Sequence, residues 1–297
     1  MKCRVATPFS VPQPAYKRSL RRLVREALTE DIGTGDATTR ALDLRAQIGR
    51  ARLLARSDGV LAGCDAFEMV FRRCHKNVRV TWRIREGAKF RRGTTVATVR
   101  GPASAVLTGE RTALNFLARL SGIATATRQL VDRMPRKATR LLDTRKTTPG
   151  WRFLEKHATA IGGACNHRLG LYDAIMVKDN HIAACGDLDT AVRRAQRRRA
   201  GRRVICEVRD MHQIETALAA GVDWLLLDNF TPARLRRAVP SIRNRERRDK
   251  RRIILEASGN ITARNIVVIA RTGVDFISVG AITHSAPAVD FSLKWVG

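Results

Sequence analysis

The chain has 297 residues, which is long enough to bury a large core in one big domain, or in a big domain and a smaller one. No stretch approaches the roughly 20 consecutive apolar residues that a membrane span requires. Three prolines (Pro8, Pro12 and Pro14) interrupt the N-terminal segment, which lacks the apolar core of a signal peptide. We therefore expect residues 1–15 to form a disordered lead and the protein to be cytoplasmic.

The formal net charge of +29 is extreme for an enzyme and raises the question of nucleic-acid binding. Two tracts carry much of the excess, RRAQRRRAGRR at 193–203 and IRNRERRDKRR at 242–252. Neither tract contains an aromatic residue, so a base-stacking platform is not indicated. Two interpretations remain open: the tracts are solvated helix faces and a loop, or they bind polyanions, with nucleic acid as an incidental partner.

Six cysteines are scattered along the chain without a CxxC pair. This spacing argues against a zinc site and against a thioredoxin-type redox motif. In a cytoplasmic protein we expect these thiols to be reduced and mostly buried.

The N-terminal part combines helices with short β-type runs. Apolar residues at helical spacing predict a helix over Tyr16 to Thr29, and a long amphipathic helix begins at Thr108. Between these helices, β-type runs alternate with glycine-containing turns. The runs span 52–55, 78–84 and 94–99. We assign residues 16–125 to a compact N-terminal α/β domain and expect segment 286–297 to pack back on it.

From residue 126 to residue 285, short apolar strands alternate with amphipathic helices. The expected strands span 140–143, 172–177, 204–208, 224–227, 253–255 and 276–279. The expected helices span 188–200, 212–220, 232–239 and 262–271. Such strands joined by helices predict a parallel sheet covered by helices, and one helix for each strand favours a closed or nearly closed β/α barrel. The motifs GxGxxG and GxxxxGK[ST] are absent, which weakens the alternative of a doubly wound sheet.

In a β/α barrel the chemistry lies at the C-terminal ends of the strands. All six predicted strands end in polar residues or glycine: Arg145 and Lys146, Lys178 and His181, Glu207, Asp228 and Asn229, Glu256 with Ser258 and Gly259, and Gly280. A rim with several arginines and lysines is typical of a site for a ligand with several negative charges. The pattern therefore predicts a polyanion-binding site at one end of the barrel.

Two carboxylates of this rim, Glu207 and Asp228, end neighbouring strands. Such a pair suits Mg²⁺, which binds through one or two carboxylates together with substrate phosphates and water. The alternative is that the two carboxylates only form ion pairs with Lys178 and Arg145.

The tripeptide Ser258-Gly259-Asn260, followed by a predicted helix start, resembles a phosphate cradle of backbone N–H groups. The same tripeptide is also an ordinary turn. Gly280 adds a place where a ligand can approach the backbone closely at the next strand end.

The histidines do not form a metal site. His157 and His167 lie ten residues apart, and no third histidine or cysteine completes a ligand set. We expect His167 to form hydrogen bonds beside Arg168, which binds a carboxylate, and His157 to be structural.

The order and spacing of eight motifs identify a family. They are EDIGTGDATT at 30–39, GERTALN at 109–115, LSGIAT at 120–125, DTRKTTPG at 143–150, GGACNHRLGLYDAIMVKDNHI at 162–182, LLLDNF at 225–230, LEASGNI at 255–261 and ISVGAITHS at 277–285. Over almost its whole length the chain resembles the quinolinate phosphoribosyltransferases, which are type II phosphoribosyltransferases also called carboxylating nicotinate-nucleotide pyrophosphorylases.

The resemblance implies an N-terminal α/β sandwich domain and a C-terminal incomplete α/β barrel. It implies that quinolinate and 5-phosphoribosyl 1-pyrophosphate react to give nicotinate mononucleotide, pyrophosphate and CO₂, with Mg²⁺ as the cofactor. It further implies a homodimer in which one subunit completes the barrel site of the other.

The resemblance also assigns roles to residues. Arg145, His167 and Arg168 would hold the pyridine dicarboxylate, with Arg111 reaching in from the partner subunit. Lys146 and Lys178 would face the phosphates as catalytic residues. Glu207 and Asp228 would serve the ribose and Mg²⁺. Ser258, Gly259, Asn260 and Gly280 would cradle the 5-phosphate.

The chain departs from the family pattern at Arg209, where an acidic or neutral residue is usual, and in the two basic tracts. Two other functions remain as alternatives. One is a related enzyme that transfers phosphoribose to another acceptor, such as nicotinate or a molybdenum-related compound, and release of CO₂ from quinolinate distinguishes it. The other is a basic nucleic-acid-binding protein that has kept an enzyme fold, although phosphate-backbone binding does not need Glu207 and Asp228 at strand ends.

Overall fold

The computed structural model describes residues 9–44, 47–135 and 139–296, and the chain forms two compact units. The sandwich unit comprises Val11–Gln129, Lys146–Gly163 and Ala281–Gly297. The barrel unit comprises Met1–Ser10, Leu130–Arg145 and Ala164–Gly280. The structure thus groups Lys146–Gly163 with the sandwich unit, although the sequence places this segment in the barrel. No helix among the described residues is long and apolar enough to span a membrane.

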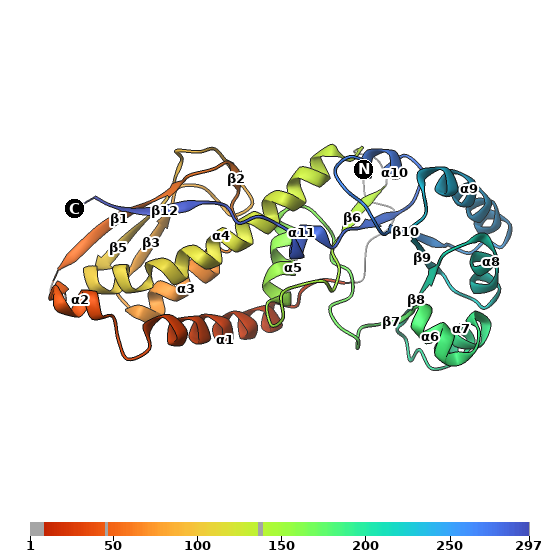
Figure 1. The fold of residues 1–297 in the computed structure, drawn as a ribbon, viewed down its shortest axis with the longest axis horizontal. Coiled ribbons are helices and arrows are strands. Elements are labelled where there is room, and N and C mark those ends of the chain that lie inside the picture. The colour runs from red at the N-terminus through yellow and green to blue at the C-terminus, as the bar shows by residue number, and fades with distance from the viewer. Residues whose placement is uncertain (1–8, 45–46, 136–138, 297) are drawn as a thin grey trace. The chain divides into compact units, whose positions relative to one another are not determined.

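The sandwich unit contains an antiparallel sheet with helices on one face (Figure 1). Its strand order is β12-β1-β5-β3, and the strands span Phe291–Trp295, Ile48–Ala55, Thr95–Pro102 and Arg79–Trp82. Helices α1 (Gln13–Ile32), α3 (Cys64–Cys74) and α4 (Ala103–Arg133) cover this sheet. Strand β1 alternates exposed and buried residues, as expected for a sheet with one covered face. The unit also holds α2 (Ala37–Ala41), the short pair β2 (Gly59–Val60) and β4 (Lys89–Phe90), α5 (Arg152–Ile161) and α11 (Ala281–His284).

The C-terminal segment belongs to this sheet, because β12 pairs with β1 along its whole length. On its way there, the segment passes close to α4. A Cβ added at Gly122 would lie 2.1 Å from the carbonyl oxygen of Pro287. Only glycine allows this approach, which explains the glycine within the long helix.

The structure differs from the predicted disordered lead over residues 9–15. Helix α1 begins at Gln13, with a proline in its first turn, which is a favourable helix start. Phe9 is buried in the interior of the barrel unit, where it packs among apolar strand residues. Residues 1–8 lie outside the described part of the chain.

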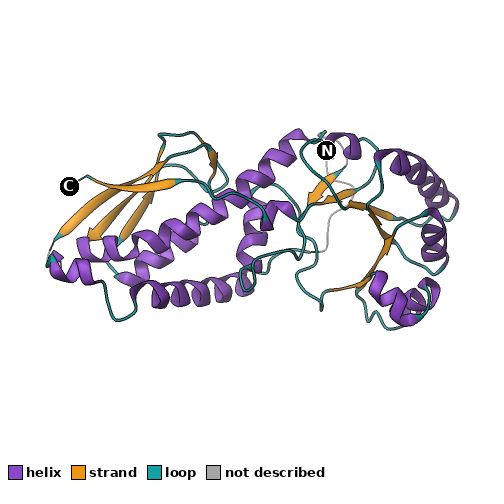
Figure 2. Ribbon diagram, viewed as in Figure 1, coloured by secondary structure: helices purple, strands orange, loops and turns teal. Residues whose placement is uncertain are grey.

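The barrel unit contains six parallel strands in the order β6-β11-β10-β9-β8-β7. They span Arg140–Leu142, Phe276–Ser278, Ile254–Ser258, Trp224–Asp228, Arg203–Val208 and Ala174–Val177. Consecutive strands from β7 to β11 are neighbours, and β6 pairs with β11. Among the described strands, β6 and β7 form the two edges of the sheet and do not pair with each other, so the barrel is not closed. Figure 2 shows helices on the outside of this curved sheet. The predicted incomplete α/β barrel is therefore confirmed.

The helices of the barrel unit are α6 (Asp179–Cys185), α7 (Leu188–Arg197), α8 (Met211–Ala219), α9 (Pro232–Arg248) and α10 (Ile266–Ala270). Two predicted helices have the wrong length. Helix α9 continues well beyond residue 239 because Pro240 lies within the helix without ending it. Helix α10 is much shorter than predicted, because residues 261–265 are not helical and residues 263–265 form a turn.

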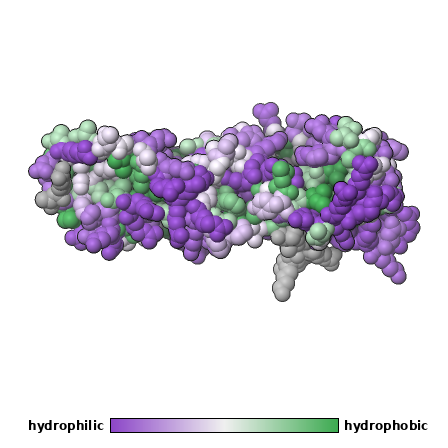
Figure 3. Space-filling view, turned by 90° about the horizontal axis from the view of Figure 1, so that it is seen from below, coloured by the Kyte–Doolittle hydropathy of each residue, from purple (hydrophilic) through white to green (hydrophobic). Residues whose placement is uncertain are grey.

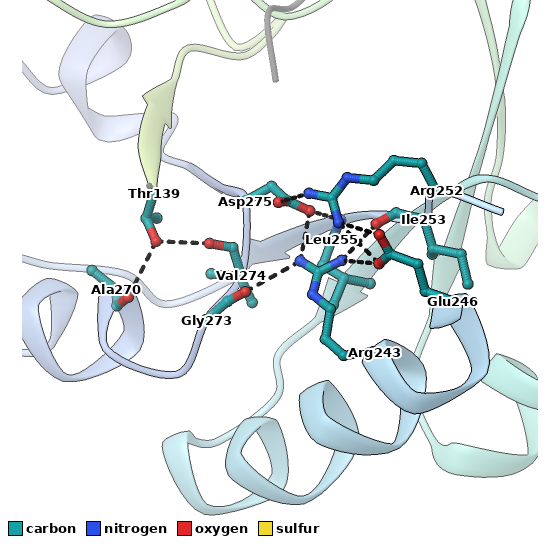
Figure 4. Close-up of polar contacts among 10 residues, drawn as sticks. All are labelled: Thr139, Arg243, Glu246, Arg252, Ile253, Leu255, Ala270, Gly273, Val274 and Asp275. Carbon is teal, nitrogen blue, oxygen red and sulfur yellow. Dashed lines mark hydrogen bonds and ion pairs between the residues drawn. The ribbon is translucent and has the colours of Figure 1, made fainter. Parts of the chain in front are cut away.

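The second basic tract, 242–252, forms the end of α9 and the loop before β10, and several of its arginines are paired. Arg243 and Arg252 both form ion pairs with Glu246 and with Asp275, which immediately precedes β11 (Figure 4). The Asp275 carboxylate also accepts a hydrogen bond of 2.8 Å from the backbone N–H of Leu255. This Arg–Glu–Arg–Asp cluster fastens the end of α9 to the beginning of β10 and β11. The loop is therefore a structured junction and not only a solvated surface.

The first basic tract, 193–203, is less neutralised. Arg193 pairs with Asp189 on α7 at 2.7 Å, and Arg203 pairs with Asp223 at 3.5 Å. The arginines at positions 197–199 are exposed and have no ion-pair partner among the described residues. Figure 3 shows that the outer face of the barrel unit around its helices is mostly hydrophilic in this view.

Candidate active site

Side chains alternate between the two faces of a strand, so every second residue of a barrel strand faces inward. Along β9, Trp224, Leu226 and Asp228 share one side, and Trp224 and Leu226 belong to the apolar interior. The register pairs Leu226 with Glu207 of β8 and with Glu256 of β10. Glu207 and Glu256 are therefore level with each other on the inner face. The interior changes from apolar to acidic toward the C-terminal end of the sheet.

A buried segment between α5 and β7 carries His167 and Arg168, and Asp143, directly after β6, holds it in place. One oxygen of the Asp143 carboxylate accepts a hydrogen bond of 2.7 Å from the backbone N–H of His167, and the other accepts one of 2.7 Å from the Asn166 amide. Asp143 has no exposed surface, so these bonds are formed away from water and fix the loop firmly.

The orientation of His167 follows from its two ring nitrogens. Nδ1 accepts a hydrogen bond of 2.7 Å from the backbone N–H of Arg168, and Nε2 lies 3.2 Å from a carboxylate oxygen of Glu256. An imidazole with its proton on Nε2 satisfies both contacts. Glu256 is fully buried and also accepts a hydrogen bond of 2.9 Å from the indole of Trp224. Phe9 stacks on the His167 ring with a centroid separation of 5.8 Å.

Arg145 and Arg168 bring two positive charges close together. The Arg168 side chain is buried, and its guanidinium donates a hydrogen bond of 3.1 Å to the carbonyl of Ala174. Burial, and then the neighbouring charge of Arg145, lower the pKa of Arg168 below its ordinary value. Two guanidinium groups that repel each other in a partly buried environment are stabilised by an anion that binds both. Together with His167, they form a site suited to a compact dicarboxylate.

The acidic side of the rim pairs directly with Lys178. This lysine follows β7, and its ammonium lies 3.0 Å from a carboxylate oxygen of Glu207, which is buried. Asp228, at the end of β9, accepts a hydrogen bond of 2.9 Å from the amide of Asn229. The predicted grouping of Lys178, Glu207 and Asp228 at neighbouring strand ends is thus present in the structure.

Arg209 lies among these acidic residues, and the sequence does not place it in the site. Its guanidinium forms a hydrogen bond of 2.7 Å with Asp179 and lies 4.0 Å from Glu207 and 3.9 Å from Asp228. A hydrogen bond from the backbone N–H of Asn180, followed by the contact with Arg209, holds the pKa of Asp179 below its ordinary value. The available signal was the position of Arg209, two residues after Glu207 and directly after the end of β8.

The segment Ser258-Gly259-Asn260 forms a tight turn that is held by Asn229. The Asn229 N–H donates to the Ser258 carbonyl at 2.8 Å, and the Asn260 amide donates to the Asn229 side chain at 3.0 Å. Gly259 has a φ of +92°, and a Cβ there would lie 2.1 Å from Asn229 Oδ1. The helix predicted to begin directly after this turn is wrong, because α10 starts only at Ile266. Gly280 follows β11, two residues after the end of the strand.

Two predicted site residues lie in the sandwich unit. Lys146 is exposed, and its carbonyl accepts a hydrogen bond of 2.8 Å from the Thr283 hydroxyl. Arg111 lies on α4 with an exposed side chain. His157, which the sequence assigns to structure, packs its ring against Tyr16 with a centroid separation of 4.5 Å. This contact agrees with a structural role.

The donors at the acidic rim fit Mg²⁺ in their chemistry. Glu207 and Asp228 offer hard carboxylate oxygens, and their contacts with Arg209 are long. The described residues contain no group of three acidic, histidine or cysteine side chains that could hold a metal ion by itself. An ion bound here would therefore need water and phosphate oxygens as further ligands, as is usual for Mg²⁺.

A barrel that gathers two arginines, a lysine and two carboxylates at its strand ends defines an enzyme that acts on a polyanionic substrate. The family model for the C-terminal domain of quinolinate phosphoribosyl transferase matches residues 123–294, and the model for the N-terminal domain matches residues 36–121. The chain belongs to the quinolinate phosphoribosyltransferase family.

Individual relatives agree with this assignment. A probable carboxylating nicotinate-nucleotide pyrophosphorylase of Bacillus subtilis is 41% identical over 276 residues, which is 92% of each chain. The solved structure of the nicotinate-nucleotide pyrophosphorylase from Francisella tularensis has a TM-score of 0.87 and 39% identity, over 97% of this chain and 98% of that one. A structure from Streptococcus pyogenes has a TM-score of 0.88 and 34% identity, over 98% of this chain and all of the other.

Proposed function

We propose that this protein transfers phosphoribose from 5-phosphoribosyl 1-pyrophosphate to quinolinate and releases pyrophosphate and CO₂, forming nicotinate mononucleotide. Family membership over both domains supports the reaction class. The observation that supports quinolinate as the acceptor is the pair Arg145 and Arg168 beside His167. Two adjacent cations match the two carboxylates of quinolinate. A monocarboxylate such as nicotinate offers only one anionic group to the two guanidinium groups.

In the proposed mechanism these residues act mainly by position and charge. Arg145, Arg168 and His167 hold the ring so that its nitrogen attacks C1 of the ribose, and the bond from C1 to the pyrophosphate oxygen breaks. Lys178 and Lys146 stabilise the negative charge on the leaving pyrophosphate. Glu207 and Asp228 lie near the ribose, where positive charge develops in the transition state.

Decarboxylation then uses the product of the first step. The quaternised ring nitrogen draws electrons from the bond between the ring and the 2-carboxylate, so that CO₂ leaves and the ring carbon takes up a proton. The protein contributes a partly dry pocket that orients this carboxylate against the buried Arg168.

Mg²⁺ completes the proposal as the cofactor. Glu207 and Asp228 would hold it together with the substrate, and bound Mg²⁺ would neutralise charge on the pyrophosphate. Removal of Mg²⁺ with a chelator should abolish product formation, and adding it back should restore it.

One assay tests the function and its alternative. The purified protein is incubated with quinolinate, phosphoribosyl pyrophosphate and Mg²⁺, and both nicotinate mononucleotide and CO₂ are measured. Equal amounts of the two products are expected. Product formation from nicotinate without CO₂, and none from quinolinate, would instead identify the related enzyme that uses another acceptor.

Two substitutions test the dicarboxylate site. Arg168→Ala and Arg145→Ala should each lower kcat/KM for quinolinate by an amount equivalent to about 2–5 kcal/mol, because a charged ligand group loses its partner in a partly buried place. Arg193→Ala removes a paired arginine from the outer helix α7 and should leave kcat/KM unchanged. If Arg168→Ala retained the wild-type value, the proposed binding role would be wrong.

We infer that the enzyme is a cytoplasmic homodimer in which Arg111 serves the site of the partner subunit. The five described cysteines are free, which agrees with a reducing compartment. Mixing of two inactive variants tests the dimer. Refolding Arg111→Ala together with Arg168→Ala should restore about a quarter of the wild-type activity, because half of the dimers are mixed and each mixed dimer has one intact site. No recovery would mean that Arg111 acts within its own subunit, and an Arg111→Ala variant that is active by itself would mean that Arg111 is not needed.

A further inference from the structure

Arg209 contacts acidic residues from three neighbouring strand ends of the barrel. Asp179 follows β7, Glu207 lies in β8 and Asp228 ends β9. One nitrogen of the guanidinium is shared between Asp179, at 2.7 Å, and Glu207, at 4.0 Å, and the Nε atom lies 3.9 Å from Asp228. A single side chain thus faces all three carboxylates.

The backbone holds Arg209 in this place from both sides. Its N–H donates a hydrogen bond of 2.8 Å to the Gln213 side chain in the first turn of α8. Its carbonyl accepts a hydrogen bond from the guanidinium of Arg234, which in turn lies over the ring of Phe230 at 4.2 Å. The position of Arg209 at the rim therefore follows from the fold and does not depend on its contacts with the carboxylates.

Arg209 changes the charge balance of this part of the rim. Among the described residues, these three carboxylates have one other ion-pair partner, the ammonium of Lys178, which contacts Glu207 at 3.0 Å. A guanidinium stays charged at every pH at which the protein is folded, so the compensation is permanent. The contacts with Glu207 and Asp228 are too long for strong hydrogen bonds, and these carboxylates keep oxygens for other ligands.

We propose that Arg209 is a positioning residue that acts as the resident counter-cation of the Mg²⁺-binding carboxylates. In the substrate-free enzyme it keeps a divalent ion from binding tightly to Glu207 and Asp228. The ion then enters together with the pyrophosphate of the substrate, whose oxygens complete its ligand set and offer Arg209 new anionic partners. This inference rests on the proposed function, since it assigns Glu207 and Asp228 to the metal.

The test measures divalent-ion binding without substrate, with Mn²⁺ as the probe. Titration of the substrate-free protein, followed by the electron paramagnetic resonance of free Mn²⁺, should give weak binding for the wild type. Arg209→Gln should bind Mn²⁺ at least about tenfold more tightly, because a positive charge about 4 Å from two of the carboxylates is removed. Arg209→Lys keeps the charge and should bind Mn²⁺ as weakly as the wild type.

Arg193→Gln is the matched control. It makes the same change of charge on a side chain of similar exposure, 52% against 54% for Arg209, which is also paired to an aspartate at 2.7 Å. Its Mn²⁺ affinity should equal that of the wild type. Equal Mn²⁺ affinities of Arg209→Gln and the wild type, or an equal gain in Arg193→Gln, would overturn the proposal. Circular dichroism verifies that each variant is folded.

The activity assay separates this proposal from the proposed function. A wild-type protein that makes no nicotinate mononucleotide refutes the function, whereas the Mn²⁺ titration reports on Arg209 alone. In an active enzyme, Arg209→Gln should also raise the KM for phosphoribosyl pyrophosphate by about tenfold at fixed Mg²⁺, because one cation that meets the pyrophosphate is lost.

Discussion

At the scale of single residues, Glu256 shows how the barrel interior supports the site. Its carboxylate is fully buried and accepts hydrogen bonds from His167, which we propose binds quinolinate, and from Trp224, which fills the apolar interior. A buried carboxylate is costly unless its oxygens are bonded, so these contacts are needed for folding as well as for orientation. Glu256 thus couples the orientation of His167 to the stability of the barrel.

Glu256→Gln tests this coupling. The amide keeps the size of the side chain but removes its negative charge, and the N–H groups of His167 and Trp224, which both donate to the same oxygen of Glu256, then bind a neutral acceptor. We expect the free energy of unfolding in urea to fall by about 1–3 kcal/mol, and the KM for quinolinate to rise because His167 is held less firmly. Glu215→Gln, at an exposed site on α8, should change the free energy of unfolding by less than about 0.5 kcal/mol. Equal stability of the two variants would contradict the expectation.

Phe9 is a second residue whose role depends on the tertiary structure. It lies far from the barrel strands in sequence, yet its ring contacts His167 and Trp224 in the interior. Phe9→Ala should lower the free energy of unfolding by about 3 kcal/mol, because it leaves a cavity in a packed core. Urea unfolding monitored by tryptophan fluorescence would report it, since Trp224 lines the same interior. A fully stable variant would show that the aromatic contact contributes little.

At the scale of elements, helix α9 is fastened to the sheet by the cluster of Arg243, Glu246, Arg252 and Asp275 (Figure 4). The sequence shows these residues as part of a basic tract. In the structure, two of the arginines instead share two acidic partners, Glu246 within α9 and Asp275 directly before β11. The cluster compensates charges that would otherwise repel each other at the end of one helix.

This cluster predicts a pH dependence of stability. Burial raises the pKa of Glu246, but hydrogen bonds and charges of Arg252 and Arg243 outweigh it and hold the pKa below the ordinary 4.5. A carboxyl group with a lowered pKa stabilises the folded state fully above its ordinary pKa, and this stabilisation disappears as the pH falls through the lowered value. Glu246→Gln should therefore be less stable than the wild type at pH 7, by about 1 kcal/mol because the cluster is partly solvated.

Urea unfolding at a series of pH values measures this effect. The difference between the wild type and Glu246→Gln should shrink progressively as the pH falls below 4.5, because the Glu246 carboxylate is then protonated in the folded state as well. A difference that is the same at pH 7 and at low pH would mean that Glu246 acts through packing rather than through its charge.

At the scale of the whole molecule, the charge of +29 is much larger than the active site requires. Part of it is compensated locally, as at the end of α9. The arginines at 197–199, at the end of α7, have no ion-pair partner among the described residues. These three side chains are the best candidates for contact with a polyanion.

Elution from a heparin column tests which charges bind. The wild type should elute at high salt, because binding through phosphate-like or sulfate groups releases counterions. Changing Arg197, Arg198 and Arg199 to glutamine should lower the eluting salt concentration more than the same change at Arg18, Arg21 and Arg25, which lie exposed on α1. Equal shifts would mean that only the total charge matters, and elution that is independent of salt would exclude polyanion binding.

The sequence by itself determined the family, the alternation of strands and helices in the barrel, and the residues at the strand ends. These features are local: side-chain periodicity and helix-start signals act over a few residues, and the motifs have a characteristic spacing. The sequence also placed Lys178, Glu207 and Asp228 on one rim, because parallel strands bring their C-terminal ends together. It did not predict the length of α9, since Pro240 is tolerated inside the helix once the Arg243 cluster fastens its end.

Only the tertiary structure decided which partner each polar group has. His167 and Glu256 are separated by 89 positions, and Phe9 reaches the barrel interior from the N-terminal segment. Arg209 meets acidic residues of three strands, of which the sequence shows only Glu207 nearby. These contacts depend on strand register and on inward or outward orientation, which are set by packing across the whole barrel and not by any local run of residues.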